Sequence, residues 1–386
     1  MAFKFASRSC LIPLLRLGVM NIAVLLIFLL LAEFALRLAA LEKPAFYQFH
    51  PVRGFSHRPG ATGWWNQEGR GWVSINKAGF RDSNHAALPT KGVLRVAVLG
   101  DSFSEAFQVN QNQTWWAQLQ KQVNHKPDCT MISNYPKGLE VMNFGVGAYG
   151  TGQQLLTWRS DVRHNKPNLV ILAVFLGNDI NDNTPAARND RPSFYLDQNG
   201  TLQINNDFRQ SPVSIFRNSL PGRSLNWFVA HSRLAQLLNE AKNRSANPIN
   251  SNSKSNQNTP PQVAPASPSG WALTEALIKQ LNTEVTANRA KLVVVSLSSP
   301  EQVWPRRNQR PSQLFAKEKR LAALLQPLEI SYMALAPAMQ QQADQKGLIL
   351  HGFGKAQGIG HWNINGHQLA ATVLAQQICT DKQLIK

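Results

Sequence analysis

Short apolar runs that alternate with amphipathic stretches predict a layer of parallel β-strands connected by α-helices. Five runs are typical of strands buried on both faces. They lie at Leu94–Leu99, just before Asn143, and at residues 168–177, 291–297 and 330–335. The amphipathic stretches predict helices at residues 115–123, 153–164, 271–288 and 365–379. Strands that alternate with helices favour right-handed crossovers, so we expect a parallel α/β sheet.

A longer apolar run occupies residues 17–41 and predicts a transmembrane helix. At about 1.5 Å per residue it can cross a hydrocarbon core of roughly 30 Å. Lys4, Arg8 and Arg16 precede it, so residues 1–16 are expected in the cytoplasm and everything after residue 41 outside. A cleaved signal peptide is the alternative, but residues 37–40 form a poor cleavage site. We therefore expect a single-pass inner-membrane anchor with the rest of the chain in the periplasm.

The part beyond the anchor divides into three stretches by composition. Residues 42–90 form a membrane-proximal region rich in Gly, Trp and Arg. Its Trp64, Trp65 and Trp72 either present rings to a sugar or fill a small hairpin against the main domain. Residues 91–386 are expected to form the main domain. Residues 243–270 are polar and broken by proline, which predicts a disordered insertion within that domain.

The net charge of the chain indicates which classes of partner it can bind. The 386 residues include 40 Lys and Arg against 22 Asp and Glu, a formal net charge of +18. This balance favours an anionic neighbour such as a phospholipid surface, an acidic glycan or a cell-wall polymer. Export and the lack of a nucleic-acid motif argue against nucleic acid. Arg306, Arg307 and Arg310 follow the strand at 291–297, and form either a loop that binds an anionic polymer or a solvated face.

Cysteine and histidine usage adds two expectations. Cys129 and Cys379 both lie in the exported part and either pair in an oxidising compartment or remain buried thiols, whereas Cys10 lies on the cytoplasmic side. His351, His361 and His367 are not spaced like a zinc site, so no metal is expected.

Four segments place reactive groups where strands end. Gly100-Asp101-Ser102 follows the first strand, so the Ser102 hydroxyl would project from the carboxyl edge of the sheet. The glycine-rich stretch from Asn143 to Gly150 offers backbone amides, and Asn178 offers a side-chain amide after the third strand. His361 opens the last helix and can serve as a general base. Taken singly, each segment is also an ordinary turn or cap sequence.

In this order, the four segments resemble the SGNH (GDSL-type) hydrolase superfamily from about Gly92 to Ile378. The stretch from Ile75 to Asp82 also looks like the segment before the nucleophile strand in membrane-anchored bacterial members. The resemblance implies a flavodoxin-like three-layer α/β/α sandwich and no cofactor. It further implies that Ser102 attacks an ester carbonyl with His361 as base. The oxyanion would be held by the Ser102 amide, an amide of the glycine loop at Gly147 or Ala148, and the Asn178 side chain.

Two positions depart from the family pattern. Ala148 stands where the oxyanion glycine is usual; its amide survives, but alanine adopts positive φ less freely than glycine. Gly358 and Ile359 stand where the family carries the aspartate before the catalytic histidine. His361 must then be oriented by a backbone carbonyl within residues 355–360, giving a Ser-His dyad, or by a distant carboxylate such as Asp344 or Asp182.

The sequence therefore predicts a membrane-anchored, extracytoplasmic serine esterase. It would remove O-acyl groups, acetyl above all, from a cell-surface or cell-wall glycan through an acyl-enzyme on Ser102. Three alternatives stay open on sequence alone. They are an O-acyltransferase using the same site, a lipid esterase, and a non-catalytic glycan-binding or assembly protein that kept the scaffold.

Overall fold

The chain forms two compact units, which we describe separately. The computed structural model describes residues 8–39, 41, 44–126, 128–184, 190–246 and 268–380. One unit combines residues 1–45 with 223–252, and the other combines residues 46–222 with 253–386. The predicted disordered insertion at 243–270 lies mostly outside the described residues. Its first residues complete one helix and its last residues begin another.

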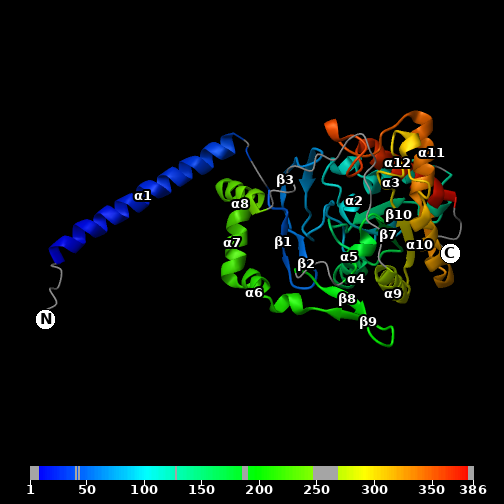
Figure 1. Ribbon diagram of the computed structural model, residues 1–386, viewed down its shortest axis with the longest axis horizontal. Helices are drawn as coiled ribbons and strands as arrows, with labels where there is room; N and C mark the ends of the chain where they lie inside the picture. The colour runs from blue at the N-terminus through cyan, green and yellow to red at the C-terminus, as the bar shows by residue number, and fades with distance from the viewer. Residues whose placement is uncertain are drawn as a thin grey trace. The chain divides into compact units, whose positions relative to one another are not determined.

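The larger unit is built on a five-stranded parallel sheet (Figure 1). The strand order across the sheet is β11-β10-β7-β5-β6. Along the chain the strands are β5 (Leu94–Leu99), β6 (Leu139–Asn143), β7 (Leu169–Val174), β10 (Lys291–Ser296) and β11 (Ser331–Ala334). Counted along the chain, this is the flavodoxin-like order 2-1-3-4-5, so the predicted sheet and fold class are confirmed.

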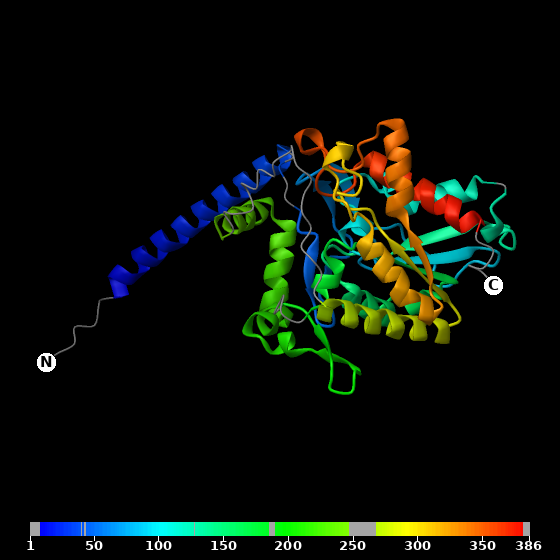
Figure 2. The ribbon, with the colours of Figure 1, turned by 45° about the vertical axis from the view of Figure 1, so that its right-hand side comes forward.

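Side chains alternate between two buried layers on opposite faces of the sheet. On β10, Val293 and Val295 pack into one apolar cluster, whereas Leu292 and Val294 pack into the other. The first cluster is covered by α3 (Trp115–Asn124), α11 (Leu335–Lys346) and α12 (Ile364–Thr380). The second is covered by α4 (Thr151–Ser160), α9 (Pro268–Ala287) and α10 (Ala316–Leu325). Figure 2 shows helices on both sides of the sheet, which completes the α/β/α sandwich.

The helix after β5 is shorter than a crossover helix and does not lead to the next strand. It is the single turn α2 (Ser102–Glu105), and the chain leaves it at Ala106 in the left-handed region (φ 54). The guanidinium of Arg81 binds the carbonyls of Glu105, Ala106 and Val109. These contacts hold the left-handed exit from the turn in place, and the crossover helix begins later, at α3.

Two antiparallel hairpins precede the sheet and belong to the same compact unit. They are β1 (Tyr47–His50) with β2 (Gly54–His57), and β3 (Thr62–Trp65) with β4 (Gly71–Ser74). Phe46, Val73 and Phe107 lie in a small apolar cluster that joins them to the loop after α2. On the second hairpin, Trp64 and Trp72 contact each other edge to face, with ring centroids 5.4 Å apart. The region between residues 46 and 90 is thus built onto the sheet domain.

Between α5 (Asp179–Asp182) and α9, the described residues form a hairpin and three α-helices. The hairpin is β8 (Ser193–Leu196) with β9 (Leu202–Asn205), and the helices are α6 (Pro212–Asn218), α7 (Leu220–His231) and α8 (Arg233–Ala246). Most of α7 and all of α8 fall in the smaller unit, together with α1 (Arg8–Leu38). Residues Arg16–Leu38 of α1 have a mean hydropathy of 2.6 and are not buried. This stretch is long and apolar enough to cross a membrane, by length and composition.

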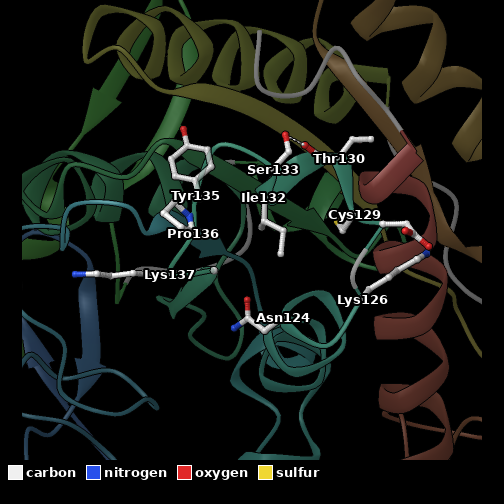
Figure 3. Close-up of a pocket in the computed structure, with 11 residues that line it drawn as sticks. Asn124, Lys126, Cys129, Thr130, Ile132, Ser133, Tyr135, Pro136 and Lys137 are labelled. Atoms are coloured by element: carbon white, nitrogen blue, oxygen red, sulfur yellow. Dashed lines mark hydrogen bonds between the residues drawn. The ribbon is translucent and has the colours of Figure 1, made fainter.

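A disulfide joins Cys129 to Cys379 across 250 residues. Cys129 lies in the segment after α3 and Cys379 in the last turn of α12, so the bond connects that segment to α12 within the same apolar cluster. Figure 3 shows the surface around Cys129, where the segment between α3 and β6 lines a hollow of about 620 Å³. The sequence left open whether Cys129 and Cys379 form a disulfide or remain buried thiols, and the structure has the disulfide.

Reduction of this disulfide should destabilise the larger unit. Opening a loop of this length restores chain entropy to the unfolded state, which corresponds to about 3–5 kcal/mol of stability. We expect the melting temperature to fall by about 10 °C on addition of dithiothreitol. A Cys129→Ala/Cys379→Ala double variant should melt at the lower temperature and not respond to the reductant. An unchanged melting temperature of the wild-type protein on complete reduction would contradict this expectation.

Candidate active site

Ser102 lies at the turn between β5 and α2, at the carboxyl edge of the sheet. The Asp101 carboxylate accepts a hydrogen bond of 3.0 Å from the Phe103 amide and so caps the single helical turn. Asp101 itself is buried, whereas Ser102 is partly exposed. The cap fixes the turn in which the Ser102 hydroxyl faces outward from the sheet edge.

Hydrogen bonds from Arg81 and Asn143, together with Asp82, stabilise the turn that carries Ser102. Arg81 is fully buried and donates to backbone carbonyls of residues 105–109. Asn143 Nδ2 donates to the carbonyls of Arg81 and Ser104, both at 3.1 Å. The Asp82 carboxylate accepts from the Asn143 amide at 2.7 Å. The segment before β5 therefore braces the turn that carries Ser102.

His361 lies in the loop before α12 and points its imidazole at Ser102. His361 Nε2 is 2.8 Å from Ser102 Oγ, and the imidazole packs against the Phe103 ring with centroids 5.0 Å apart. The next residue, Trp362, is fully buried and donates from Nε1 to Ser298 Oγ at 2.9 Å. This anchored tryptophan fixes the loop, so the hydroxyl and the imidazole that sequence reasoning proposed are brought into hydrogen-bond contact.

A third residue, Glu68, completes the line on the far side of the imidazole. Glu68 Oε2 is 2.5 Å from His361 Nδ1, and Glu68 Oε1 accepts from the His361 amide at 2.7 Å. Glu68 lies in the connection between β3 and β4. The neighbouring Gly69 leaves no room for a Cβ against the Gln108 carbonyl and the Phe353 ring. The hairpin is therefore packed tightly between the nucleophile loop and the histidine loop.

Gly360 makes the contact between Glu68 and His361 sterically possible. Its φ is +78°, in the left-handed region, and a Cβ built there would lie 1.8 Å from Glu68 Oε1. A side chain at residue 360 would therefore displace the carboxylate from the backbone amide that it accepts from.

Of the two alternatives that the sequence left open for orienting His361, the structure has a distant carboxylate, that of Glu68, in place of a backbone carbonyl and a Ser-His dyad. In the backbone stretch 355–360, the Gly360 carbonyl is 2.7 Å from His351 Nδ1 instead. Asp182 accepts from Asn178 Nδ2 at 2.5 Å, and Asp344 holds Arg310 through two contacts of 2.6 and 2.7 Å. His361 Nδ1 is bonded to Glu68 and not to Asp182, Asp344 or the Gly360 carbonyl.

Glu68 and His361 each stabilise the charged form of the other. Burial disfavours the imidazolium, but the hydrogen bond and the negative charge of Glu68 outweigh this and raise the pKa of His361 above its usual value. Burial alone would raise the pKa of Glu68, but the hydrogen bonds and charge of His361 lower it. Glu68 thus stays ionised, and it makes His361 a stronger base and stabilises the imidazolium that forms when the serine proton is taken up.

Ser102, Ala148 and Asn178 line the same cavity, and each carries an N–H group that could bind an oxyanion, whereas the Gly147 amide is already bonded to Glu105. The Ser102 amide is at the first position of α2, where an amide has no intrahelical acceptor. Within the described part of the chain, no hydrogen bond is formed by the Ala148 amide. Asn178 uses one of its two amide protons on Asp182 and keeps the other. The Gly147 amide donates to Glu105 Oε1 at 2.8 Å, so the sequence-based assignment of Gly147 to the oxyanion hole is corrected.

Ala148 occupies the left-handed region with φ 60, as a glycine would at this position. We expect Ala148→Gly to raise the free energy of unfolding by about 0.5–1 kcal/mol, because the strain of a left-handed alanine exceeds the added unfolded-state entropy of glycine. Thermal melting of both proteins measures this. Ala338→Gly within α11 is the matched control and should lower stability by up to about 1 kcal/mol. Destabilisation by both substitutions would contradict the assignment of strain to Ala148.

A buried carboxylate fixes the loop that carries Ala148. Glu105 Oε1 accepts from the Tyr47 hydroxyl at 2.7 Å and lies 2.6 Å from His57 Nε2, besides its bond to the Gly147 amide. His57 is fully buried. Glu105, the last residue of α2, therefore binds both the first hairpin and the loop that carries Ala148.

Ser102, His361, Ala148 and Asn178 line one cavity of about 790 Å³, a size typical of small-molecule sites. Its other walls include the acidic residues Glu105, Asp182 and Asp190, and Arg191. The aromatic lining residues are Tyr47, Phe55, Trp65, Phe103 and Phe175. The cavity thus combines aromatic and acidic residues in the wall that holds the nucleophile.

The other histidines and the basic loop lie outside this constellation. His367 accepts from the Trp115 amide at 3.3 Å, and burial lowers its pKa to about 3, so it is a packed core residue. Arg310 is bound to Asp344 and its side chain is only 8% exposed, whereas the Arg307 side chain is 63% exposed. Binding of an anionic polymer by Arg306, Arg307 and Arg310 stays a prediction. Among the described residues, no cluster of His, Cys, Asp and Glu could hold a metal ion.

Comparison with known proteins identifies the family. The GDSL-like Lipase/Acylhydrolase family model matches residues 96–372. The chain belongs to this family. It is therefore an ester hydrolase of the GDSL (SGNH) type, as the resemblance in the sequence indicated. A search of the curated proteins finds no match.

Solved structures align with most of the chain at low sequence identity. The acetyl xylan esterase AlAXEase is 10% identical with a TM-score of 0.37, covering 74% of this chain and 99% of that one. TesA is 13% identical with a TM-score of 0.37, covering 72% and 95%. A GDSL-like lipase from Bacteroides thetaiotaomicron is 15% identical with a TM-score of 0.34, covering 75% and 90%.

Proposed function

We propose that this GDSL hydrolase is a membrane-anchored serine esterase that removes O-acyl groups, mainly acetyl, from a cell-surface or cell-wall glycan outside the cytoplasm. The observation that carries the proposal is the continuous line from Ser102 Oγ through His361 to Glu68, 2.8 and 2.5 Å long at its two contacts, in the wall of one cavity. This is the arrangement needed to activate a hydroxyl nucleophile.

The reaction divides into two steps that use the same groups. His361 Nε2 takes the Ser102 proton as Oγ attacks the ester carbonyl, and then delivers that proton to the leaving sugar hydroxyl. Water enters, gives a proton to His361 and attacks the acyl carbonyl. The bond from the acyl carbon to Ser102 Oγ then breaks, His361 returns the proton to Oγ, and the acid is released. In both tetrahedral intermediates the negative oxygen faces the amides of Ser102 and Ala148 and the Asn178 side chain.

The lining of the cavity supports a sugar ester as the substrate. Aromatic walls suit the faces of sugar rings, and carboxylates accept hydrogen bonds from sugar hydroxyls. Glu105, Asp182 and Asp190 line the cavity against one guanidinium, that of Arg191. A neutral acylated sugar fits this balance at the reacting ester better than an anionic one. An anionic part of the polymer would instead lie at the exposed Arg307.

The apolar helix α1 and the disulfide support the proposed location. We place Arg16–Leu38 across the inner membrane, with the basic residues before it in the cytoplasm and the hydrolase unit in the periplasm. The Cys129–Cys379 disulfide is suited to an oxidising compartment of that kind.

The test is acyl release by the full-length protein in detergent or nanodiscs. We expect acetate to be released from acetylated glycans, and p-nitrophenyl acetate to be cleaved faster than esters of longer acyl chains. Cleavage of long-chain esters alone, with no acetate released from any acetylated glycan, would overturn the glycan proposal in favour of a lipid esterase. Appearance of the acetyl group on an added acceptor sugar instead of as free acetate would establish an acyltransferase.

A further inference from the structure

The apolar helix α1 carries an acidic residue close to its carboxyl end, and α8 supplies its partners. The Glu33 carboxylate accepts hydrogen bonds from the amides of Arg233 and Leu234, both at 3.0 Å, and from the Ser232 hydroxyl at 2.9 Å. One helix of the unit thus caps the amino end of another. Figure 1 shows α8 beside the carboxyl end of α1.

Arg37 adds a second charged contact between α1 and the connection from α7 to α8. Arg37 lies one turn after Glu33, forms an ion pair with it at 2.7 Å and donates to the His231 carbonyl at 2.6 Å. The last carbonyl of α7 and the first amides of α8 are therefore both bound to the same turn of α1. Charged groups inside an apolar span are costly without partners, and here the partners come from the α7–α8 corner.

The contacts of Glu33 and Arg37 with residues 231–234 determine how deep the connection between α7 and α8 lies in a bilayer. Glu33 lies five residues before Leu38, the end of the apolar span. At 1.5 Å per residue this is about 7 Å inward from the end of the span. Interfacial helices lie at about this depth, with their apolar side buried 5–10 Å into the boundary between headgroups and acyl chains.

Large apolar side chains on both helices are exposed. The exposed fraction is 50% for Leu225, 64% for Trp227 and 55% for Phe228 on α7, and 64% for Leu238 on α8. On α8, Leu234, Leu237, Leu238 and Ala241 recur at helical spacing, so this helix has an apolar stripe. Residues 223–246 also contain Arg223, Arg233, Lys242 and Arg244 against one acid, Glu240. Exposed Trp, Phe and Leu together with basic residues are typical of helices at anionic lipid surfaces.

We propose that α7 and α8 form a second membrane contact, lying in the bilayer interface with Trp227, Phe228 and Leu238 among the lipid headgroups and upper acyl chains. The proposal rests on α1 spanning the membrane. The occupant is lipid because Glu33 and Arg37 fix these helices to the span itself, at interfacial depth. A soluble partner protein would have to reach the same side chains at the level of the headgroups.

The test uses the full chain in vesicles of phosphatidylethanolamine and phosphatidylglycerol. In a Cys10→Ser background, an environment-sensitive fluorophore is attached to Phe228→Cys or Leu238→Cys, while the buried Cys129–Cys379 disulfide is left intact. Quenching is measured with lipids spin-labelled at the headgroup or deep in the acyl chain. We expect blue-shifted emission and strong quenching by the shallow label at both positions.

Two control positions separate this inference from the anchor. Leu26→Cys, inside the apolar span, should be quenched by the deep label, and Leu88→Cys, an exposed apolar position of the larger unit, should be quenched by neither. Deep quenching at Leu26 with water-like emission at Phe228 and Leu238 would overturn the inference and leave the anchor intact. Blue-shifted emission without lipid quenching there would overturn it in favour of a protein partner. Loss of quenching at Leu26 as well would remove both the anchor and the inference.

Discussion

Replacing Ser102 with alanine should lower kcat for ester hydrolysis by about 10⁵–10⁶-fold, to a level near the background. The hydroxyl is the group that His361 Nε2 contacts at 2.8 Å, and among the residues described no other hydroxyl is bonded to that nitrogen. Without it no acyl-enzyme forms. The measurement is the initial rate with p-nitrophenyl acetate, together with covalent labelling by a fluorophosphonate.

Labelling provides the control for this experiment. Wild-type protein and Ser133→Ala, which changes an exposed serine that does not line the active-site cavity, should both be labelled at Ser102. Ser102→Ala should be unlabelled with an unchanged melting temperature. A folded Ser102→Ala protein that still hydrolyses esters at the wild-type rate would refute the assignment of the nucleophile. A wild-type protein that neither reacts nor turns over would favour the non-catalytic scaffold.

Glu68→Gln should lower kcat by up to about 10⁴-fold while Ser102 remains in place. The carboxylate holds the His361 tautomer that has its free nitrogen toward Ser102, and an amide at residue 68 no longer favours that tautomer or the imidazolium. Because Glu68 raises the pKa of His361, its removal should also shift the acidic limb of the kcat/KM profile to lower pH. Activity needs a neutral imidazole, so the limb follows the His361 pKa downward.

Asp344→Asn is the matched control for Glu68→Gln. Asp344 is an acid that sequence reasoning considered for the same role, but it binds Arg310 and Arg307. This variant should keep the wild-type pH profile and kcat, even if its melting temperature falls. Equal losses of kcat in the two variants, with the acidic limb unmoved in both, would show that Glu68 has only a structural effect.

The sheet and most of its crossovers were predictable from the sequence because strands buried on both faces leave an unambiguous apolar pattern. Leu94–Leu99 and Leu169–Val174 are continuous apolar runs apart from the buried Arg95, and each is followed by residues typical of a turn. The short α2 was harder to foresee. The chain leaves this helix at Ala106 in the left-handed region, where Arg81, a residue earlier in the chain, binds the carbonyls of Glu105 and Ala106.

The acid of the site was not predictable for a related reason. Glu68 and His361 are 293 residues apart, and Glu68 stands in a polar hairpin connection that carries no motif. The family pattern directs attention to Gly358 and Ile359, next to the histidine. Only tertiary packing of the second hairpin shows that the charge comes from the other end of the domain. The choice between the amides of Gly147 and Ala148 likewise depends on Glu105, which is distant in sequence.

Glu68 lies outside residues 96–372, the stretch by which the family is recognised. A fragment cut to that stretch would retain the sheet, the serine and the histidine but would lack the residue that polarises them. We therefore expect catalysis to depend on an amino-terminal hairpin that lies before the stretch matched by the family model. Relatives whose histidine loop lacks an acid are worth inspecting upstream of the serine before they are classed as inactive.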